Sequence, residues 1–184
     1  PSGFSVQDPV LPIFSVWSAD GRWLAIGGLE GLAVLERNGS TRHQVGSSKE
    51  SPIGFTPDGR RLVSRDGSVS SRSVLHFWTL PEGQLERTLE LPERTGVHLC
   101  GDRLLTLSFD TAEPGRERSI PAHLLSLDGR TLQELGTWRP WGRVSFEVDA
   151  SGTWIVWAEG RRVLQQRLDA LSAPPRVLGE HGGD

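Results

Sequence analysis

The chain has 184 residues, 36% of them hydrophobic, and a formal net charge of −3 at pH 7. Its 20 basic and 23 acidic residues are interspersed, so the sequence lacks the clustered positive charge that is typical of nucleic-acid binding. No apolar run approaches the roughly 20 residues that are needed to cross a bilayer. We therefore expect neither nucleic acid nor a membrane as a partner.

Cysteine usage and the first residues bear on the compartment. Cys100 is the single cysteine, which excludes an internal disulfide framework and a Cys-based zinc site. A lone cysteine is compatible with a reducing cytoplasm, and we expect a cytoplasmic protein. Residues 1–4 carry no positive region followed by an apolar stretch, so no secretory signal is visible. A secretory signal that processing has already removed is the alternative.

A glycine-centred turn recurs four times, and an apolar pair follows it three and four residues later each time. These glycines, 38, 42 and 51 residues apart, are Gly21, Gly59, Gly101 and Gly152. A second column of turn glycines consists of Gly39, Gly83 and Gly129. Periods of roughly 40–50 residues are typical of propeller blades and of helical arrays, so the local pattern must decide between them.

The segments between the turns indicate strands, because they are short, alternate in polarity with period two, and are rich in β-branched and aromatic residues. In the first unit we expect strands at 13–18, 22–26, 32–35 and 42–45. In the second unit we expect them at 52–55, 61–64, 74–78 and 84–91. Asp-Gly, Gly-Gly and Asn-Gly dipeptides between them supply the positive φ that tight hairpins require. Only residues 165–171 are expected to be briefly helical.

The predicted fold class is all-β, with four four-stranded antiparallel blades in a single propeller segment over residues 1–184. The expected blades are 11–46, 51–91, 95–137 and 142–180, and residues 1–10 are a candidate outer strand of a preceding blade. Propellers close in a circle of about 4–8 blades, and residues 178–181 look like the lead into another blade. We therefore expect a part of a larger propeller, completed by further blades or by a second chain.

Two segments resemble WD-repeat propellers and their bacterial relatives built on a Ser-Pro-Asp-Gly turn. Residues 55–63 are similar to the turn between the first two strands of that family, and residues 18–25 repeat it. Residues 76–83 are similar to the segment that names the family, with Thr79 in place of the aspartate. No Gly-His pair precedes a first strand, so the family's Asp-His-Ser/Thr-Trp hydrogen-bond network is not implied.

Two connections are longer than their counterparts, namely residues 65–72 and 110–118. Equivalent connections emerge on one propeller face, where WD-repeat proteins commonly engage partners, although loop growth of this kind is also tolerated at little cost. Two tryptophans flank the connection beside these loops and are expected to be exposed contacts. The candidate partner-binding residues are Arg65, Asp66, Arg72, Asp110, Glu113, Arg116, Arg118, Trp138 and Trp141.

The remaining aromatic and titratable residues favour structural roles. Packing within or between blades is expected for Trp17, Trp23, Trp78, Trp154 and Trp157. The histidines show no metal-ligand spacing, so we expect no metal site and no cofactor, and we interpret His76 and His98 as hydrogen-bonded structural residues. Caps of their own hairpin turns are expected at Asp20, Asp58 and Asp149.

Cys100 follows His98 by two residues, which places both side chains on one face of a strand. A buried cysteine that acts as a small hydrophobe is favoured over a nucleophile, because no orienting third group is visible.

These observations favour a noncatalytic interaction, sensor or scaffold module with a protein partner. The resemblance implies a segment of a larger bacterial signalling, regulatory or defence protein. The alternative is a propeller that binds a small ligand, or hydrolyses a substrate, in its central channel.

Overall fold

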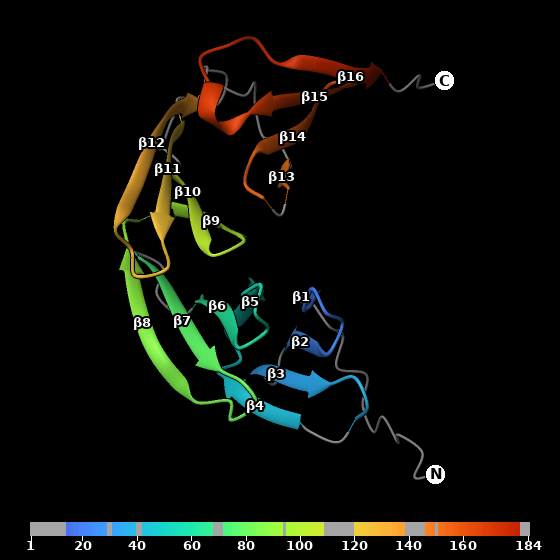
Figure 1. The fold of residues 1–184 in the computed structure, drawn as a ribbon, viewed down its shortest axis with the longest axis vertical. Helices are drawn as coiled ribbons and strands as arrows, with labels where there is room; N and C mark the ends of the chain where they lie inside the picture. The colour runs from blue at the N-terminus through green and yellow to red at the C-terminus, as the bar shows by residue number, and fades with distance from the viewer. Residues whose placement is uncertain are drawn as a thin grey trace. The chain divides into compact units, whose positions relative to one another are not determined.

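The computed structural model describes residues 14–28, 31–39, 42–67, 72–93, 95–108, 120–138, 146–149 and 151–180. They form four antiparallel sheets of four strands each, and within every sheet the strands are neighbours in chain order (Figure 1). The expected all-β fold of four four-stranded blades is thereby confirmed. The chain divides into two compact units, residues 1–70 with 74–88, and residues 71–73 with 89–184.

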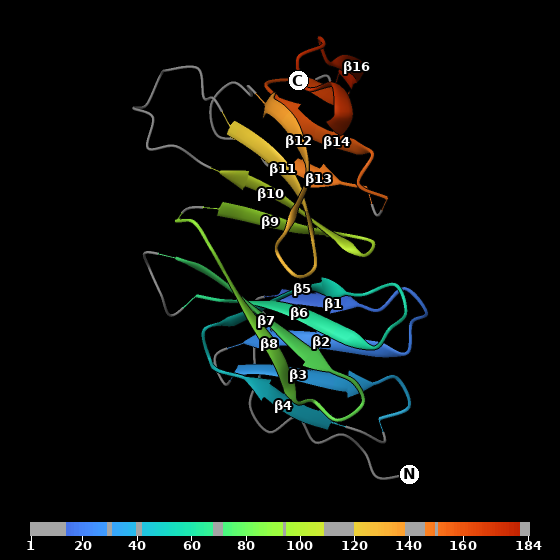
Figure 2. The same ribbon diagram turned by 60° about the vertical axis from the view of Figure 1, so that its left-hand side comes forward.

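The first two sheets follow the glycine turns. The first sheet consists of β1 (Phe14–Trp17), β2 (Trp23–Gly28), β3 (Gly31–Glu36) and β4 (Arg42–Gly46). The second consists of β5 (Glu50–Phe55), β6 (Arg61–Asp66), β7 (Ser73–Thr79) and β8 (Leu85–Leu91). In the first unit, β5 packs against β1, β2 and β3 (Figure 2). The core between them contains Trp23, Ala25, Leu32, Val34, Val45, Leu62, Trp78 and Leu80.

The third and fourth sheets lie in the second unit. The third consists of β9 (Thr95–Cys100), β10 (Arg103–Ser108), β11 (Ile120–Ser126) and β12 (Thr131–Trp138). The fourth consists of β13 (Phe146–Val148), β14 (Trp154–Glu159), β15 (Arg162–Arg167) and β16 (Arg176–Glu180). The expected helix at 165–171 is reduced to one 3-10 turn, η1 (Leu168–Ala170), because residues 165–167 continue the ladder of β15 with β14. No α-helix occurs among the residues that the structure describes.

The repeated glycines make the hairpins possible. Gly21, Gly59, Gly101 and Gly152 have φ between 62° and 68°, a left-handed conformation that only glycine adopts at little cost. The aspartates before two of them cap the turns as expected. Asp58 Oδ1 accepts hydrogen bonds from the Thr56 hydroxyl at 2.6 Å and from the Arg60 backbone N–H at 3.0 Å. These bonds hold the pKa of Asp58 below its ordinary value.

Among the described tryptophans, most pack in the sheets, and Trp17 does not. Trp23, Trp78 and Trp157 are 2%, 7% and 4% exposed, as the expected packing roles require. Trp17 is 53% exposed, so its predicted packing between blades is wrong. The reason is the pleat of β1: its neighbour Val16 packs against the core, and alternation turns Trp17 to the opposite face.

Candidate functional site

The predicted partner-binding residues lie in different settings. Arg65 and Asp66 were expected in a loop, but they belong to β6, because the ladder with β7 continues as far as the pair Asp66 and Val74. Arg72 is exposed, and its Nη1 atom lies 2.6 Å from Glu90 Oε2. Outside the described residues lie Asp110, Glu113, Arg116, Arg118 and Trp141, and also residues 1–10.

Trp138 was expected to be an exposed contact, and this prediction is wrong. The residue is 1% exposed, because its indole packs against side chains of the next sheet. The ring centroid of Trp138 lies 5.1 Å from that of Phe146 and 5.3 Å from that of Trp157, both in edge-on contacts. The burial of Trp138 is thus decided by residues that follow it in β13 and β14.

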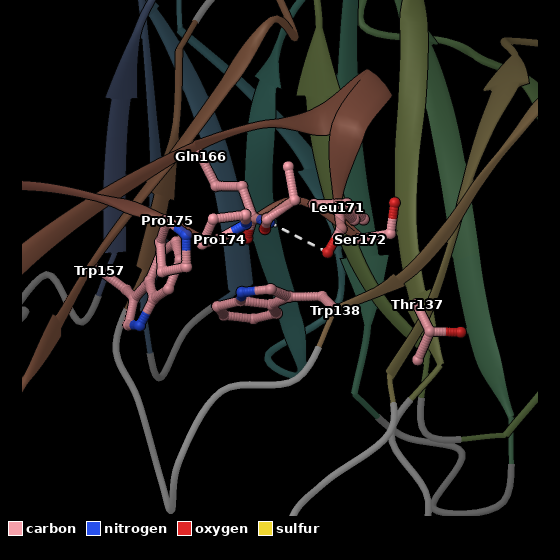
Figure 3. A pocket seen from close by; sticks show the side chains of 9 residues that line it. Thr137, Trp138, Trp157, Gln166, Leu171, Ser172, Pro174 and Pro175 are labelled. Carbon is pink, nitrogen blue, oxygen red and sulfur yellow. Dashed lines mark hydrogen bonds between the residues drawn. The ribbon is translucent and has the colours of Figure 1, made fainter.

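Trp138 nevertheless forms part of the wall of a pocket. This tryptophan pocket has a volume of about 620 Å³. Its walls come from the end of β12, from β14 and β15, and from the segment that joins η1 to β16 (Figure 3). The residues that line it are Thr137, Trp138, Trp157, Gln166, Leu171, Ser172, Ala173, Pro174 and Pro175.

Two hydrogen-bond donors in this wall lack partners. The Nε1 atoms of Trp138 and Trp157 are buried, and neither has an acceptor within hydrogen-bond distance. An indole N–H can only donate, so no rearrangement of protons satisfies it. A buried polar group without a partner costs about 1–3 kcal/mol. Two such unsatisfied donors therefore lie in one wall of the pocket.

The rest of the wall is held in place by Gln166. Its Nε2 atom donates to the backbone oxygens of Ala170, Leu171 and Ala173, at 3.3, 3.0 and 2.5 Å. Gln166 is itself 6% exposed, so one buried amide fixes the course of the chain after η1. The segment that this amide anchors carries Ser172, Pro174 and Pro175 to the pocket.

The lining of the tryptophan pocket contains no charged side chain among the described residues. Its polar groups are the two indole N–H groups, the Gln166 amide and the hydroxyls of Thr137 and Ser172. The described lining therefore offers polar groups and apolar surface but no ionic partner. A charged ligand would lose its hydration there without compensation.

A second polar cluster lies in the first unit, at the start of the second sheet. Trp78 Nε1 donates to Ser64 Oγ at 2.8 Å, and Ser64 Oγ donates to Glu50 Oε2 at 2.5 Å. Glu50 Oε1 is hydrogen-bonded to His76 Nδ1. His76 is hydrogen-bonded, as expected, and Glu50 is a residue that the sequence reasoning missed. Its position as the first residue of β5, the first strand of the unit, was the available signal.

This cluster has the features of a structural network. Glu50, Ser64 and Trp78 are 4%, 0% and 7% exposed, and their polar atoms satisfy one another. Trp78 packs edge-on against His76, with 5.7 Å between ring centroids. A fully satisfied buried network of this kind fixes strand register and side-chain packing.

The residues around Cys100 support its interpretation as a small hydrophobe. The side chain is fully buried, and burial raises the pKa of its thiol to about 11. His98 is half-buried with its ring 4.7 Å from that of Phe146, and burial lowers its pKa. A thiol that remains protonated at neutral pH is a poor nucleophile.

Metal and membrane features can be assessed for the described part of the chain. Within residues 14–180, gaps excepted, no three His, Cys, Asp or Glu side chains come together in a way that could hold a metal ion. None of the described segments forms a helix with the length and apolarity needed to span a membrane.

Comparison with known proteins identifies the fold. No family model and no curated protein matches the chain. The β-propeller domain of the Trilobed protease from Pyrococcus furiosus matches with a TM-score of 0.61 and 12% identity, over 90% of this chain and 57% of that one. The Cps50 (Swd1) propeller domain of Myceliophteria thermophila gives 0.57 and 12%, over 92% and 71%. A chain of a mitotic checkpoint complex gives 0.56 and 13%, over 89% and 48%.

At these identities the likeness concerns the fold alone. The four sheets are blades of the β-propeller type, and WD-repeat propellers are among the similar structures. The chain spans about half of two of these propeller chains and 71% of the third. The class is thus a β-propeller module.

Proposed function

We propose that this chain is a noncatalytic interaction module that binds a segment of a partner protein in the tryptophan pocket. The observation that carries the proposal is the pair of buried, unpartnered indole donors of Trp138 and Trp157 in the wall of one pocket. Large apolar side chains with a polar tip are enriched where proteins bind partners. A partner with carbonyl acceptors would complete both hydrogen bonds.

Two further observations support a partner protein. Among the similar structures, one propeller was solved as part of a mitotic checkpoint complex, so this fold serves in protein assemblies. The turns at residues 18–25 and 55–63 resemble bacterial propellers that are attached to signalling or defence proteins. We propose that this chain is a noncatalytic segment of such a larger protein and acts in the cytoplasm, with residues 65–72 and residues 110–118 as additional contacts.

We also propose that a further blade or a second chain covers one face of the fourth sheet, the face that carries Trp154, Val156 and Ala158. In the first sheet, the face with Trp23, Ala25 and Gly27 is buried against β5, and a methyl group on Gly27 would lie 2.8 Å from Pro52. The same repeat positions in the fourth sheet are Trp154, Val156 and Ala158. Trp154 and Val156 are only partly buried and Ala158 is exposed.

A small ligand is the second candidate occupant, because the volume of the pocket favours it. About 620 Å³ lies within the roughly 300–1,000 Å³ of small-molecule sites. A neutral ligand with two acceptor oxygens would satisfy the same two donors. This alternative keeps the site and changes the class of ligand.

A displayed library of random peptides, selected on the native chain, tests the proposed function. Each selected peptide is then measured against Trp157→Phe, which removes one donor, and against the matched control Trp154→Phe on the same strand outside the pocket. We expect at least a tenfold loss of affinity for Trp157→Phe and no loss for Trp154→Phe. Peptides that bind both variants equally, or the absence of any binding peptide, would contradict the proposal.

The same two variants test the small-ligand alternative. A thermal-shift screen of neutral metabolites is run on the native chain and on both variants. Stabilisation of the native chain and of Trp154→Phe, absent from Trp157→Phe, together with a peptide selection that yields nothing, would favour the small ligand.

A further inference from the structure

We infer that the tryptophan pocket takes an extended, uncharged, proline-bearing segment of a partner protein, two of whose backbone carbonyl oxygens accept hydrogen bonds from Trp138 and Trp157. This inference rests on the proposed function and specifies the chemistry of its partner. It follows from what the pocket offers and from what it lacks.

The direction of the missing hydrogen bonds restricts the occupant. The unpartnered groups are donors, so the occupant must present at least two acceptors at this wall. A polyproline II segment has no internal backbone hydrogen bonds, so all its carbonyl oxygens are free to accept. A strand added to a sheet edge would instead use backbone groups of this chain as its partners. The donors here are side chains, which favours the polyproline mode.

The occupant must also have its own donors satisfied. Every backbone N–H that it buries in the pocket needs an acceptor. The side-chain acceptors of the lining are few: the hydroxyls of Thr137 and Ser172 and the Gln166 carbonyl. Proline has no N–H, so each proline in the segment removes one such demand. A segment with proline at the positions buried against this wall therefore leaves fewer N–H groups without an acceptor.

The shape and charge of the lining are the remaining constraints on the occupant. Trp138, Trp157, Pro174 and Pro175 line the pocket, with Trp157 beside the two prolines in Figure 3. The two indole rings are 1% and 4% exposed and form the apolar backing of the wall, so the exposed rings of Pro174 and Pro175 are the surface against which a proline-bearing segment would pack. No charged side chain is present among the described lining to pair with a phosphate or an acidic residue. The segment is accordingly neutral where it enters the pocket.

Both indole nitrogens lie below the surface of the wall, so hydrogen bonding requires a shift of neighbouring side chains. Residues 172–175 are exposed and lie outside any strand, but Gln166 holds the Ala173 backbone, so the shift is expected in the side chains of Ser172, Pro174 and Pro175. Each donor gains a hydrogen bond on binding, which counts against the cost of the shift.

Two matched sets of acetylated, amidated hexapeptides test the inference, one with proline at alternating positions and the other with alanine in its place. Affinities are measured by fluorescence titration for the native chain, Trp138→Phe, Trp157→Phe and Trp154→Phe. We expect proline peptides to bind the native chain and Trp154→Phe equally, and at least tenfold more weakly to the other two variants. Alanine peptides are expected to bind at least tenfold more weakly to the native chain.

A variant at an exposed residue of the pocket tests the inference without disturbing the core. Ser172 is exposed, so Ser172→Ala leaves the core intact, and we expect it to weaken proline peptides severalfold. Peptides that depend on Trp157 but bind equally well with alanine or with charged residues would overturn the inference and leave the proposed function standing. If no peptide depends on Trp157, both fail.

Discussion

Trp138 and Trp157 meet edge to face, with 5.3 Å between their ring centroids and 79° between their planes. The two residues come from different sheets, β12 and β14, so their contact joins the third blade to the fourth within the second unit. The same pair carries the two unpartnered donors of the pocket. The two side chains proposed to bind a partner thus also pack the two blades together.

The buried position of Trp138 predicts a large loss of stability when its ring is removed. Truncation of a buried tryptophan to alanine costs about 3–5 kcal/mol, so we expect a loss of this size in the free energy of unfolding of Trp138→Ala. Leu132→Ala is the control on the same strand, because Leu132 is 46% exposed, and it should cost below about 1 kcal/mol. Urea denaturation followed by circular dichroism measures both. Equal, small effects would show that Trp138 is exposed.

The network in the first unit makes Ser64 a second sensitive position. Ser64→Ala removes the acceptor of Trp78 Nε1 and one donor to Glu50, both of them buried. We expect a loss of about 1–3 kcal/mol in the free energy of unfolding. Ser15→Ala, at an exposed position of β1, should change it by less than about 0.5 kcal/mol. A Ser64→Ala protein as stable as the control would argue against the network.

Two glycines with the same backbone conformation separate strain from packing. Gly152 and Gly160 have φ of 68° and 59°, but a methyl group at position 152 would lie 2.8 Å from Cys100 Cβ, whereas position 160 has nothing within 4 Å. Both alanine variants suffer the cost of positive φ. Only Gly152→Ala also overpacks the core, so thermal unfolding should show a further loss of about 1–3 kcal/mol in its free energy of unfolding. Equal losses would mean that the close approach to Cys100 does not exist.

The capped turns predict a dependence of stability on pH. The Thr56 hydroxyl, the Arg60 N–H and nearby Arg61 hold the pKa of Asp58 below its ordinary value of 3.8. A lowered pKa in the folded state gives stability that is present above about pH 3.8 and is lost as the pH falls through the folded-state value. Asp58→Asn lacks this contribution. The difference in free energy of unfolding between native chain and variant should therefore shrink below pH 3.8, and a constant difference would count against the cap.

The sequence predicted the blades because their signal is local. Each glycine turn lies within a few residues of the strands that it joins, so Gly21 and Gly59 mark hairpins without knowledge of the rest of the fold. The burial of Trp138 is different, since it depends on Phe146 and Trp157, which reach it through packing of two sheets. The pocket could not be predicted for the same reason.

The network around Glu50 could not be predicted, because its members come from three different strands. Trp78 donates to Ser64 and Ser64 donates to Glu50, and the three residues belong to β7, β6 and β5.

The sequence predicts a loop at Arg65 and Asp66, because polar residues at the end of a strand are typical of a connection. In the structure both residues belong to β6, because they pair with residues of β5 and β7.

The indole N–H resonances of the native chain test the role of Trp138 and Trp157 most directly. The chain has seven tryptophans, and Trp→Phe variants at 138 and 157 assign these two signals in a ¹⁵N-labelled sample. On titration with a proline-bearing, uncharged peptide, we predict that both signals move downfield and saturate together, as expected when each N–H gains an acceptor, while the Trp154 signal stays in place. Saturable binding that leaves the signals of Trp138 and Trp157 unmoved would contradict the proposed site.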